Sequence, residues 1–224
     1  MRIDIISAVP ETMQSYIDNS IIKIARDKGF VEIHLHNLHN YSENKHKKID
    51  DYPFGGASGM ILTCQPIFTL IEKLKSERQY DEIIFTSAEG EKFNQDNANY
   101  LSLKENIIIL AGHYKGIDQR VRDILITKEY SMGDFILTGG ELPALTICDS
   151  VIRLIPGAIG DSEAALTDSF MNGLLEEPQY TRPADFRGYK VPEILLSGNH
   201  AAIDKWRQEE QLRKTKRLRP DLLD

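Results

Sequence analysis

The strongest constraint on the fold is a pair of short apolar segments that flank a predicted helix. The apolar segments are Glu82–Thr86 and Ile107–Leu110, and the helix between them is expected over Asn94–Leu103. Strands that lack an alternating polar face are typical of parallel sheets, because helices cover both faces of such sheets. The sequence therefore predicts an α/β fold with a parallel sheet.

Further segments extend this pattern over the first part of the chain. Arg2–Ala8 predicts another apolar strand, and apolar residues alternate with polar ones from Val31 to Leu35, as in a half-exposed strand. Helices are expected over Ser20–Lys28, Gln65–Ser76 and Leu142–Ile155, with a long loop over Asn40–Gly59. The chain becomes polar after Gly157. We therefore expect a main domain over residues 1–157, a flexible linker over 158–170 and a small helical domain over 171–224.

The composition favours a folded protein of the cytoplasm. Hydrophobic residues make up 41% of the chain and charged residues 27%, as in ordinary globular domains. No apolar stretch has the length of a membrane span, and the first residues lack the apolar core of a signal peptide. Cys64 and Cys148 have no CxxC spacing, so we expect reduced, buried thiols.

The distribution of charge keeps a nucleic-acid partner open, although the net charge of −7 argues against one. Basic residues gather near the C-terminus: Lys205, Arg207, Arg213, Lys214, Lys216, Arg217 and Arg219. A basic face can bind phosphates on an acidic protein, because salt screens charges that lie more than about 10 Å away. The alternative is a solvated helix of mixed charge.

Two glycine-bearing loops predict a ligand pocket. The loops are Gly112–Gly116 and Gly133–Gly140, and a short apolar segment separates them. Glycine allows the backbone to approach a ligand closely, so two such loops indicate a pocket walled by main chain. The chain has neither a P-loop motif nor a GxGxxG motif that opens a helix. An adenosine-containing ligand held by irregular loops fits better, and plain turns are the alternative.

Eight motifs occur in order along the chain: IISAVPE, DDYPFGGASGM, GHYKGIDQRV, GDFILTGGELPA, SVIRLIPG, LTDSF, YTRP and LLSGNHAAIDKWR. In this order they resemble the motifs of the bacterial tRNA (guanine-N1)-methyltransferases, which belong to the knotted SPOUT class. The resemblance implies methyl transfer from S-adenosyl-L-methionine to N1 of guanosine at position 37 of tRNA, which supports reading-frame maintenance in translation. It also implies that the parallel sheet ends in a deep C-terminal trefoil knot.

In this family the methyl donor lies among the knot loops, which correspond here to Phe85–Gly90, Ala111–Gly116 and Met132–Gly140. The donor-binding positions that the resemblance implies are Thr86, Ser87, Gly112, Met132, Gly133, Asp134, Phe135, Ile136, Leu137, Gly139 and Gly140. Many relatives have Arg-Tyr-Glu-Gly where this chain has His113-Tyr114-Lys115-Gly116, so no role of that Glu is transferred here. If Lys115 touches the donor carboxylate, Lys115→Glu should weaken donor binding.

The catalytic residues implied by the resemblance are Asp168 and Arg153. Guanine N1 carries a proton at neutral pH, and a positioned carboxylate that removes it contributes about 10²–10⁴-fold to the rate. Asp168 matches the family's general base, and Arg153 matches the cation that stabilises negative charge on guanine O6. The structural alternatives are a helix N-cap for Asp168 and a side chain that extends from a buried helix for Arg153.

Members of the family are homodimers with an active site between subunits, and their C-terminal domain binds the anticodon branch of tRNA. The corresponding candidates here are Tyr180, Arg182, His200, Lys205, Trp206, Arg207 and Arg213. A core position is the alternative for Trp206, and helix capping is the alternative for His200. Relatives use Mg²⁺ transiently and without a dedicated site. His34 and His36 share one strand face but lack further ligands at zinc spacing, so no metal site is predicted.

Two other functions remain open at this stage. The first is a knotted RNA methyltransferase with a different target base, which Asp168 and the C-terminal motifs argue against. The second is an RNA-binding relative without activity, which we would expect to lack Asp168 or Arg153. Both residues are present.

Overall fold

The computed structural model describes residues 1–158 and 168–223 and divides the chain into two compact units, Met1–Ser162 and Glu163–Asp224. The predicted linker over 158–170 falls mainly on residues 159–167, which lie outside the described residues. In the described part of the chain, no helix is long and apolar enough to cross a membrane.

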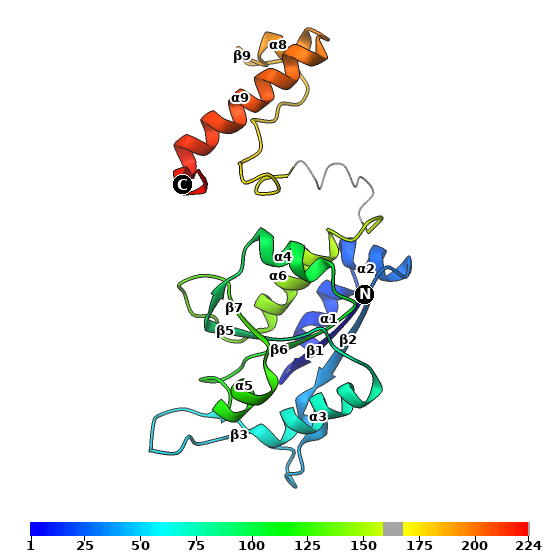
Figure 1. Ribbon diagram of the computed structural model, residues 1–224, viewed down its shortest axis with the longest axis vertical. Helices are drawn as coiled ribbons and strands as arrows, with labels where there is room; N and C mark the ends of the chain where they lie inside the picture. Colours follow the sequence, from blue (N-terminus) through cyan, green and yellow to red (C-terminus); the bar gives the residue numbers. More distant parts are fainter. Residues whose placement is uncertain (159–167, 224) are drawn as a thin grey trace. The chain divides into compact units, whose positions relative to one another are not determined.

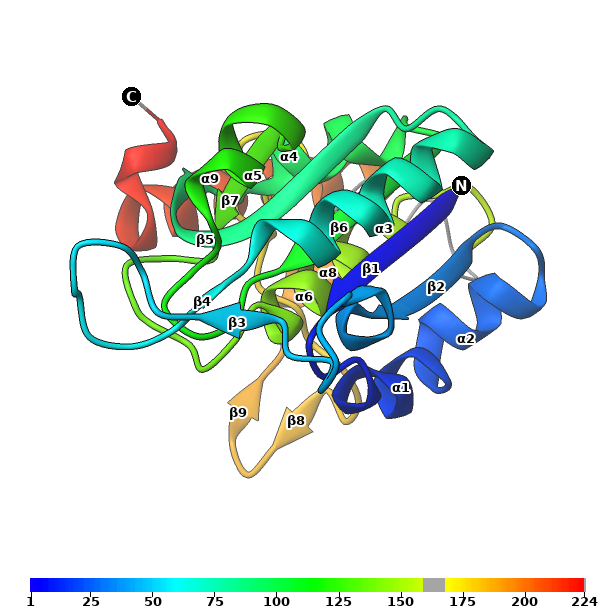
Figure 2. The same ribbon diagram turned by 90° about the horizontal axis from the view of Figure 1, so that it is seen from below.

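The described part of the larger unit contains a five-stranded sheet in the order β2-β1-β6-β5-β7. The strands are β1 (Arg2–Ser7), β2 (Glu32–Asn37), β5 (Glu82–Lys92), β6 (Asn106–Ala111) and β7 (Lys128–Ser131). Adjacent strands pair in parallel throughout this sheet, as Figures 1 and 2 show. The prediction of an α/β fold with a parallel sheet is therefore confirmed.

Helices cover both faces of the sheet (Figure 1). One face packs against α1 (Glu11–Ile17), α2 (Ser20–Asp27), α4 (Gln95–Ser102) and α6 (Glu141–Ile152). The other face packs against α3 (Cys64–Glu77) and α5 (Gln119–Leu125). Successive strand residues point to opposite faces, so Ile107 and Ile109 join the first core while Ile108 and Leu110 join the second. This arrangement explains why the segment is apolar at every position.

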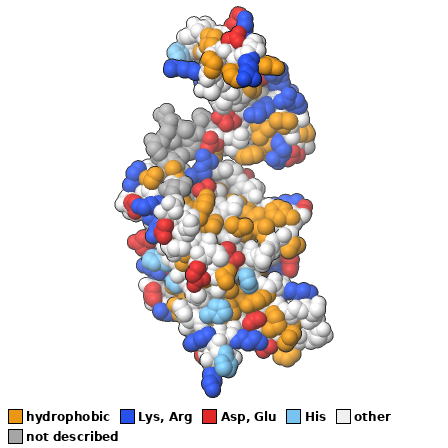
Figure 3. All heavy atoms as spheres, turned by 180° about the vertical axis from the view of Figure 1, so that it is seen from behind, with side chains coloured by type: hydrophobic (Ala, Val, Ile, Leu, Met, Phe, Trp, Pro, Cys, Tyr) orange, Lys and Arg blue, Asp and Glu red, His pale blue; other side chains and the backbone are white. Residues whose placement is uncertain are grey.

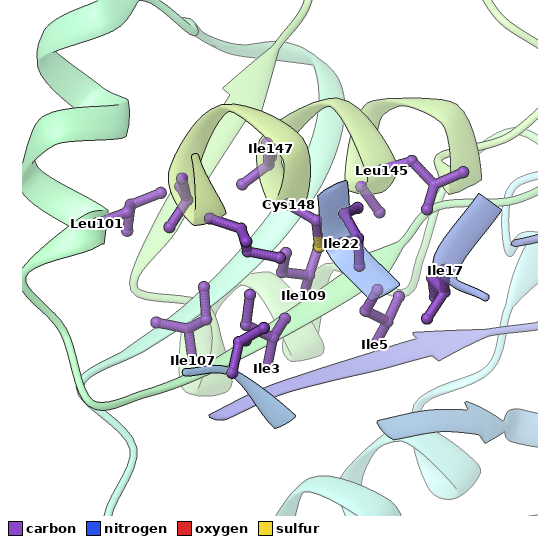
Figure 4. Close-up of a cluster of buried hydrophobic side chains, with 14 of the residues drawn as sticks. Ile3, Ile5, Ile17, Ile22, Leu101, Ile107, Ile109, Leu145, Ile147 and Cys148 are labelled. Carbon is purple, nitrogen blue, oxygen red and sulfur yellow. The ribbon is translucent and has the colours of Figure 1, made fainter. Parts of the chain in front are cut away.

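The first core lies between the sheet and α6 (Figure 4). Ile3 and Ile5 of β1 point toward Ile147 and Cys148 of α6, and all four side chains are fully buried. Burial raises the pKa of the Cys148 thiol to about 12, so this cysteine is an inert core residue, as predicted. Cys64 is partly exposed, which differs from the prediction of a buried thiol.

A buried carboxylate at Asp4 interrupts the second core. Its oxygens accept hydrogen bonds from Arg2 Nε at 2.7 Å, from the Tyr80 hydroxyl at 2.7 Å and from Arg2 Nη2 at 2.9 Å. His36 Nε2 lies 2.7 Å from Asp4 Oδ1, the oxygen that also accepts from Arg2 Nη2. Burial alone would raise the pKa of Asp4, but the hydrogen bonds from His36, Arg2 and Tyr80 outweigh burial and hold it below its usual range.

The predicted loop over Asn40–Gly59 contains short regular elements. Leu38–Tyr41 forms the 3-10 helix η1, and β3 (Asp50–Asp51) pairs antiparallel with β4 (Ile61–Leu62). The loop between β3 and β4 extends away from the sheet (Figure 2). The Leu62 amide donates to Gly116 O at 2.9 Å, which ties this hairpin to the loop after β6.

The smaller unit is less uniformly helical than predicted. It contains the hairpin of β8 (Asp185–Phe186) and β9 (Tyr189–Lys190), followed by α8 (Glu193–Leu196), α9 (His200–Leu218) and the 3-10 helix η2 (Pro220–Leu222). Two-residue strands leave too short an alternating pattern to be recognised in the sequence. Ile203 and Thr215 of α9 are buried, and Thr215 Oγ1 accepts a hydrogen bond from the Leu175 amide at 2.9 Å.

Candidate active site

A cavity of about 460 Å³ opens at the carboxyl ends of β6 and β7 and beside residues 85–89 in the middle of β5. Ligands of open α/β sheets bind at this end of the strands, and the volume is typical of small-molecule sites. The expected donor-binding positions that line it are Thr86, Ser87, Gly112, Met132, Phe135, Ile136, Leu137, Gly139 and Gly140. Gly133 and Asp134 are not among its lining residues.

Three chain segments meet at the wall of this cavity: Phe85–Gly90, Ala111–Gly116 and Met132–Gly140. The Gly140 amide donates a hydrogen bond to Gly112 O at 2.6 Å. Thr86 Oγ1 accepts from the Gly112 amide at 3.3 Å and lies 3.4 Å from Gly140 O. A Cβ atom on Gly140 would lie 2.1 Å from Thr86 Oγ1 and 2.4 Å from the Gly112 nitrogen. Glycine is therefore required at position 140 for the segments to meet.

The first of these segments is strand where a loop was predicted. β5 continues from Glu82 to Lys92 through the expected loop Phe85–Gly90, and its register against β7 shifts between Thr86 and Glu91. The continuation could not be recognised in the sequence, because polar residues such as Ser87 and Glu89 end the apolar pattern. Ser87, Ala88 and Glu89 lie within this irregular stretch of the strand, and all three line the cavity.

The third segment exposes apolar side chains. Phe135 is 56% exposed, Ile136 82% and Leu137 40%, and Leu142 in the first turn of α6 is 63% exposed. Gly133 has a φ of +145°, a conformation that L side chains rarely adopt. Exposed apolar side chains gathered in one segment indicate a surface that another molecule covers.

Charged residues that the resemblance did not assign also line the cavity. Arg122 of α5 donates to Glu129 at 2.7 Å and to Glu89 at 2.8 Å, and these bonds raise the pKa of its guanidinium. The side chain of Lys115 packs on Gly59, where a Cβ would lie 2.8 Å from Lys115 Cδ, and its Nζ lies 3.4 Å from Ser58 Oγ. The departure of GHYKG from the common family pattern was the only sequence signal for Lys115.

The proposed catalytic residues lie in different units. Arg153 follows α6 as its C-cap and is half-buried, and its amide donates to Asp149 O at 3.2 Å. Asp168 is half-buried and begins the described part of the smaller unit, where its carbonyl accepts from the Met171 amide at 3.3 Å. Among the described residues, no helix begins directly after Asp168, so the N-cap alternative for Asp168 is wrong.

The predicted tRNA-binding cations of α9 are mostly engaged in ion pairs within the smaller unit. Lys205 Nζ lies 3.9 Å from Glu209, and Arg207 lies 3.3 Å from Asp204 and 3.5 Å from Glu177. Arg213 pairs with Glu210. Several Lys and Arg side chains are visible on this unit in Figure 3. Exposed pairs of this kind are worth about 0–1 kcal/mol, so they do not prevent a phosphate from binding these cations.

A second cavity, of about 260 Å³, lies in the smaller unit and is lined by residues that include Tyr180, His200, Trp206 and Arg207. Trp206 is half-buried rather than a full core residue. The cap of α9 is Asn199, whose side chain accepts from the Ala202 amide at 3.2 Å, so the capping alternative for His200 is wrong. Arg182 is exposed. In the described residues, no three His, Cys, Asp or Glu side chains gather as a metal site.

The sequence profile described as tRNA (Guanine-1)-methyltransferase TrmD matches residues 1–224. The chain belongs to the TrmD family. A tRNA (guanine-N(1)-)-methyltransferase of Flavobacterium psychrophilum is 58% identical over 224 residues, and one of Bacteroides thetaiotaomicron is 55% identical over 224 residues; each match covers both chains completely. One of Chlorobium luteolum is 52% identical over 223 residues, 100% of this chain and 96% of its own.

Membership of the TrmD family confirms the resemblance derived from the motifs. Expected donor positions from both TrmD motifs, Gly112 of GHYKG and Phe135 to Gly140 of GDFILTGGELPA except Thr138, line one cavity together with Thr86 and Ser87. Arg153 and Asp168 are described in separate units, and their roles stay predictions.

Proposed function

We propose that this chain transfers a methyl group from S-adenosyl-L-methionine to N1 of guanosine at position 37 of tRNA, in the cytoplasm, and so supports reading-frame maintenance. The main support is a match to the TrmD family over residues 1–224 in a chain where residues of the motifs GHYKGIDQRV and GDFILTGGELPA line one cavity. The relatives are named as tRNA (guanine-N(1)-)-methyltransferases, which specifies both the substrate class and the methylated atom.

The cavity has the properties that an adenosine-containing donor requires. Its wall contains main chain at Gly112, Gly139 and Gly140, which supplies hydrogen-bonding groups without side chains in the way. Phe135, Ile136 and Leu137 add apolar surface for a ring. When bound, the donor supplies a methyl group on a positively charged sulfur, which leaves as a neutral thioether once N1 has taken the methyl group.

In the proposed reaction the residues of this chain control the proton on guanine N1. The Asp168 carboxylate accepts that proton, so the N1 lone pair becomes available to form the new N–C bond. Removal of the proton shifts negative charge onto guanine O6, and the Arg153 guanidinium stabilises this charge. Neither residue changes covalently, and the proton leaves Asp168 to solvent after the product departs.

The fold and assembly belong to the same proposal. We infer a trefoil knot at the cavity, which is consistent with the contact of Gly140 with both Gly112 and Thr86. We also infer a homodimer, in which a second copy covers the exposed Phe135, Ile136 and Leu142 side chains. Residues 171–224 of the smaller unit would bind the anticodon branch through Arg182, His200, Lys205, Arg207 and Arg213. Any Mg²⁺ would act transiently, and we assign it no residues.

Asp168→Ala tests the proposed chemistry. The variant should lose at least about 10²-fold in single-turnover methyl transfer while it binds S-adenosyl-L-methionine as tightly as the unaltered protein, because only proton removal is lost. Asp27→Asn on the exposed surface of α2 is the control and should leave both quantities unchanged. Full single-turnover activity of the Asp168→Ala protein would refute the assignment of the base.

A further inference from the structure

A buried carboxylate, Glu141, lies directly behind the cavity. Glu141 is the first residue of α6 and is 8% exposed. Its Oε1 accepts a hydrogen bond from Ser7 Oγ, at the end of β1, at 2.7 Å. Ser7 Oγ in turn accepts from the Val9 amide at 2.9 Å, so the hydroxyl hydrogen is directed to the carboxylate. Glu141 is therefore held in one orientation by the neighbouring strand.

The same carboxylate faces the ring of His113. His113 Nδ1 is buried and makes no hydrogen bond with any described residue, and it lies 3.8 Å from Glu141 Oε1. A neutral imidazole has one N–H and one lone pair, and the neighbours decide which nitrogen carries the hydrogen. A lone pair on Nδ1 would face a carboxylate without any donor, whereas an N–H on Nδ1 is attracted to it. The geometry thus favours the hydrogen on Nδ1.

The other ring nitrogen is then a hydrogen-bond acceptor on the cavity side. His113 lines the cavity, and its side chain is 22% exposed. Nε2 makes no hydrogen bond with a described residue and, unlike Nδ1, is not buried. The exposed edge of the ring therefore includes Nε2. A small movement of either residue would close the 3.8 Å gap into a hydrogen bond.

We propose that Glu141 fixes the tautomer of His113, so that His113 Nε2 accepts a hydrogen bond from an N–H or O–H group of the adenosine part of the methyl donor. Glu141 is a positioning residue, and His113 is the residue that contacts the donor. The proposal rests on the function proposed above, because it assigns the cavity to an adenosine-containing donor. Gly139 is part of the arrangement, since a Cβ there would lie 2.2 Å from Glu141 Oε2.

The order of contacts excludes a hydrolytic triad. In such a triad the imidazole lies between the hydroxyl and the carboxylate and takes the hydroxyl proton. Here the Ser7 hydroxyl donates directly to Glu141 Oε1 at 2.7 Å, and His113 Nδ1 lies 3.8 Å from the same oxygen, so the imidazole is not between the hydroxyl and the carboxylate. The Ser7 hydroxyl hydrogen is thus directed to Glu141 and not to the imidazole of His113, and the three residues form a positioning chain.

Imidazole ¹⁵N NMR of the ligand-free protein tests the first half of the proposal. The His113 signals, identified by their loss in His113→Gln, should show a protonated Nδ1 and an unprotonated Nε2. Glu141→Gln removes the charge that favours this tautomer, so the Nε2-protonated form should increase. A wild-type ring protonated on Nε2 would overturn the proposal. If Glu141→Gln fails to fold, the wild-type spectrum alone decides.

Calorimetric binding of S-adenosyl-L-homocysteine tests the second half. His113→Gln should lose about tenfold in affinity, as expected for one hydrogen bond. Glu141→Gln should weaken binding too, and the double variant should bind no more weakly than His113→Gln, because both changes act through the same bond. His34→Gln on β2 is the control and should bind normally. Normal affinity of His113→Gln, or fully additive losses, would overturn this proposal alone. Failure of the wild-type protein to bind would overturn the proposed donor site as well.

Discussion

Gly140→Ala is the substitution that most directly tests how the cavity is built. Gly140 is the N-cap of α6 with a φ of −84°, which alanine adopts without strain. The whole effect must therefore be steric. The added Cβ would lie 2.1 Å from Thr86 Oγ1, 2.4 Å from the Gly112 nitrogen and 2.9 Å from the Ala111 carbonyl carbon. Thr86 could rotate its hydroxyl away, but the two backbone atoms can move only if the segments separate.

The expected magnitude follows from these contacts. Overpacking of a tight site costs about 1–3 kcal/mol. Separation also breaks the 2.6 Å hydrogen bond from the Gly140 amide to Gly112 O, worth about 1 kcal/mol. The free energy of unfolding should therefore fall by about 2–4 kcal/mol, which lowers Tm by about 5–15 °C for a chain of this size. Affinity for S-adenosyl-L-homocysteine should fall at least about tenfold, because the displaced segments form the cavity wall.

Thermal unfolding and calorimetric binding of the same sample measure both effects. Gly55→Ala is the matched control, since Gly55 has a φ of +84° in the loop between β3 and β4 and a Cβ added there would have no atom within 4 Å. That variant should lose about 1–3 kcal/mol through backbone strain and keep its donor affinity. A Gly140→Ala protein with unchanged Tm and unchanged affinity would refute the close packing of the three segments.

Two further perturbations follow from single side chains. Because the folded-state pKa of Asp4 is lowered, its contribution to stability is complete above the ordinary carboxyl pKa of about 3.9 and is lost as the pH falls below it. In urea unfolding at pH 7, Asp4→Asn should lower the free energy of unfolding by about 3–5 kcal/mol. Below pH 4 this free energy should fall less steeply in the variant than in the unaltered protein. An equally steep fall in both proteins would contradict the role of this carboxylate. Lys115→Glu reverses a charge at the cavity and should weaken S-adenosyl-L-methionine binding severalfold, as measured by calorimetry. Lys115→Met keeps the packing on Gly59 and should weaken binding less. Equal affinities of both variants and the unaltered protein would place the Lys115 ammonium away from the donor.

The central part of the sheet could be predicted because burial on both faces leaves a clear trace in the sequence. Ile107–Leu110 is apolar at each position since its residues fill both cores. β7 was missed because Lys128 and Glu129 of this edge strand are not buried and break the apolar pattern. Helices α1 and α5 were also missed, since seven residues give only two turns in which to show periodicity.

The candidate site could be predicted only as separate motifs. Glycines at positions 112 and 140 indicated close approach of backbone, but nothing in their spacing shows that they contact one another. The family resemblance supplied the donor positions. The positions of Glu141 and His113 depend on β1, β6 and α6 meeting in space, so their pairing could be recognised only in the structure.

The most direct test of the account is methyl transfer from labelled S-adenosyl-L-methionine to two tRNA transcripts that differ only at position 37. One transcript carries guanosine there and the other adenosine. Label is expected on the guanosine transcript alone, with 1-methylguanosine recovered after digestion. Label on both transcripts would contradict the proposed target nucleotide, and label on neither, with donor binding intact, would contradict the proposed activity.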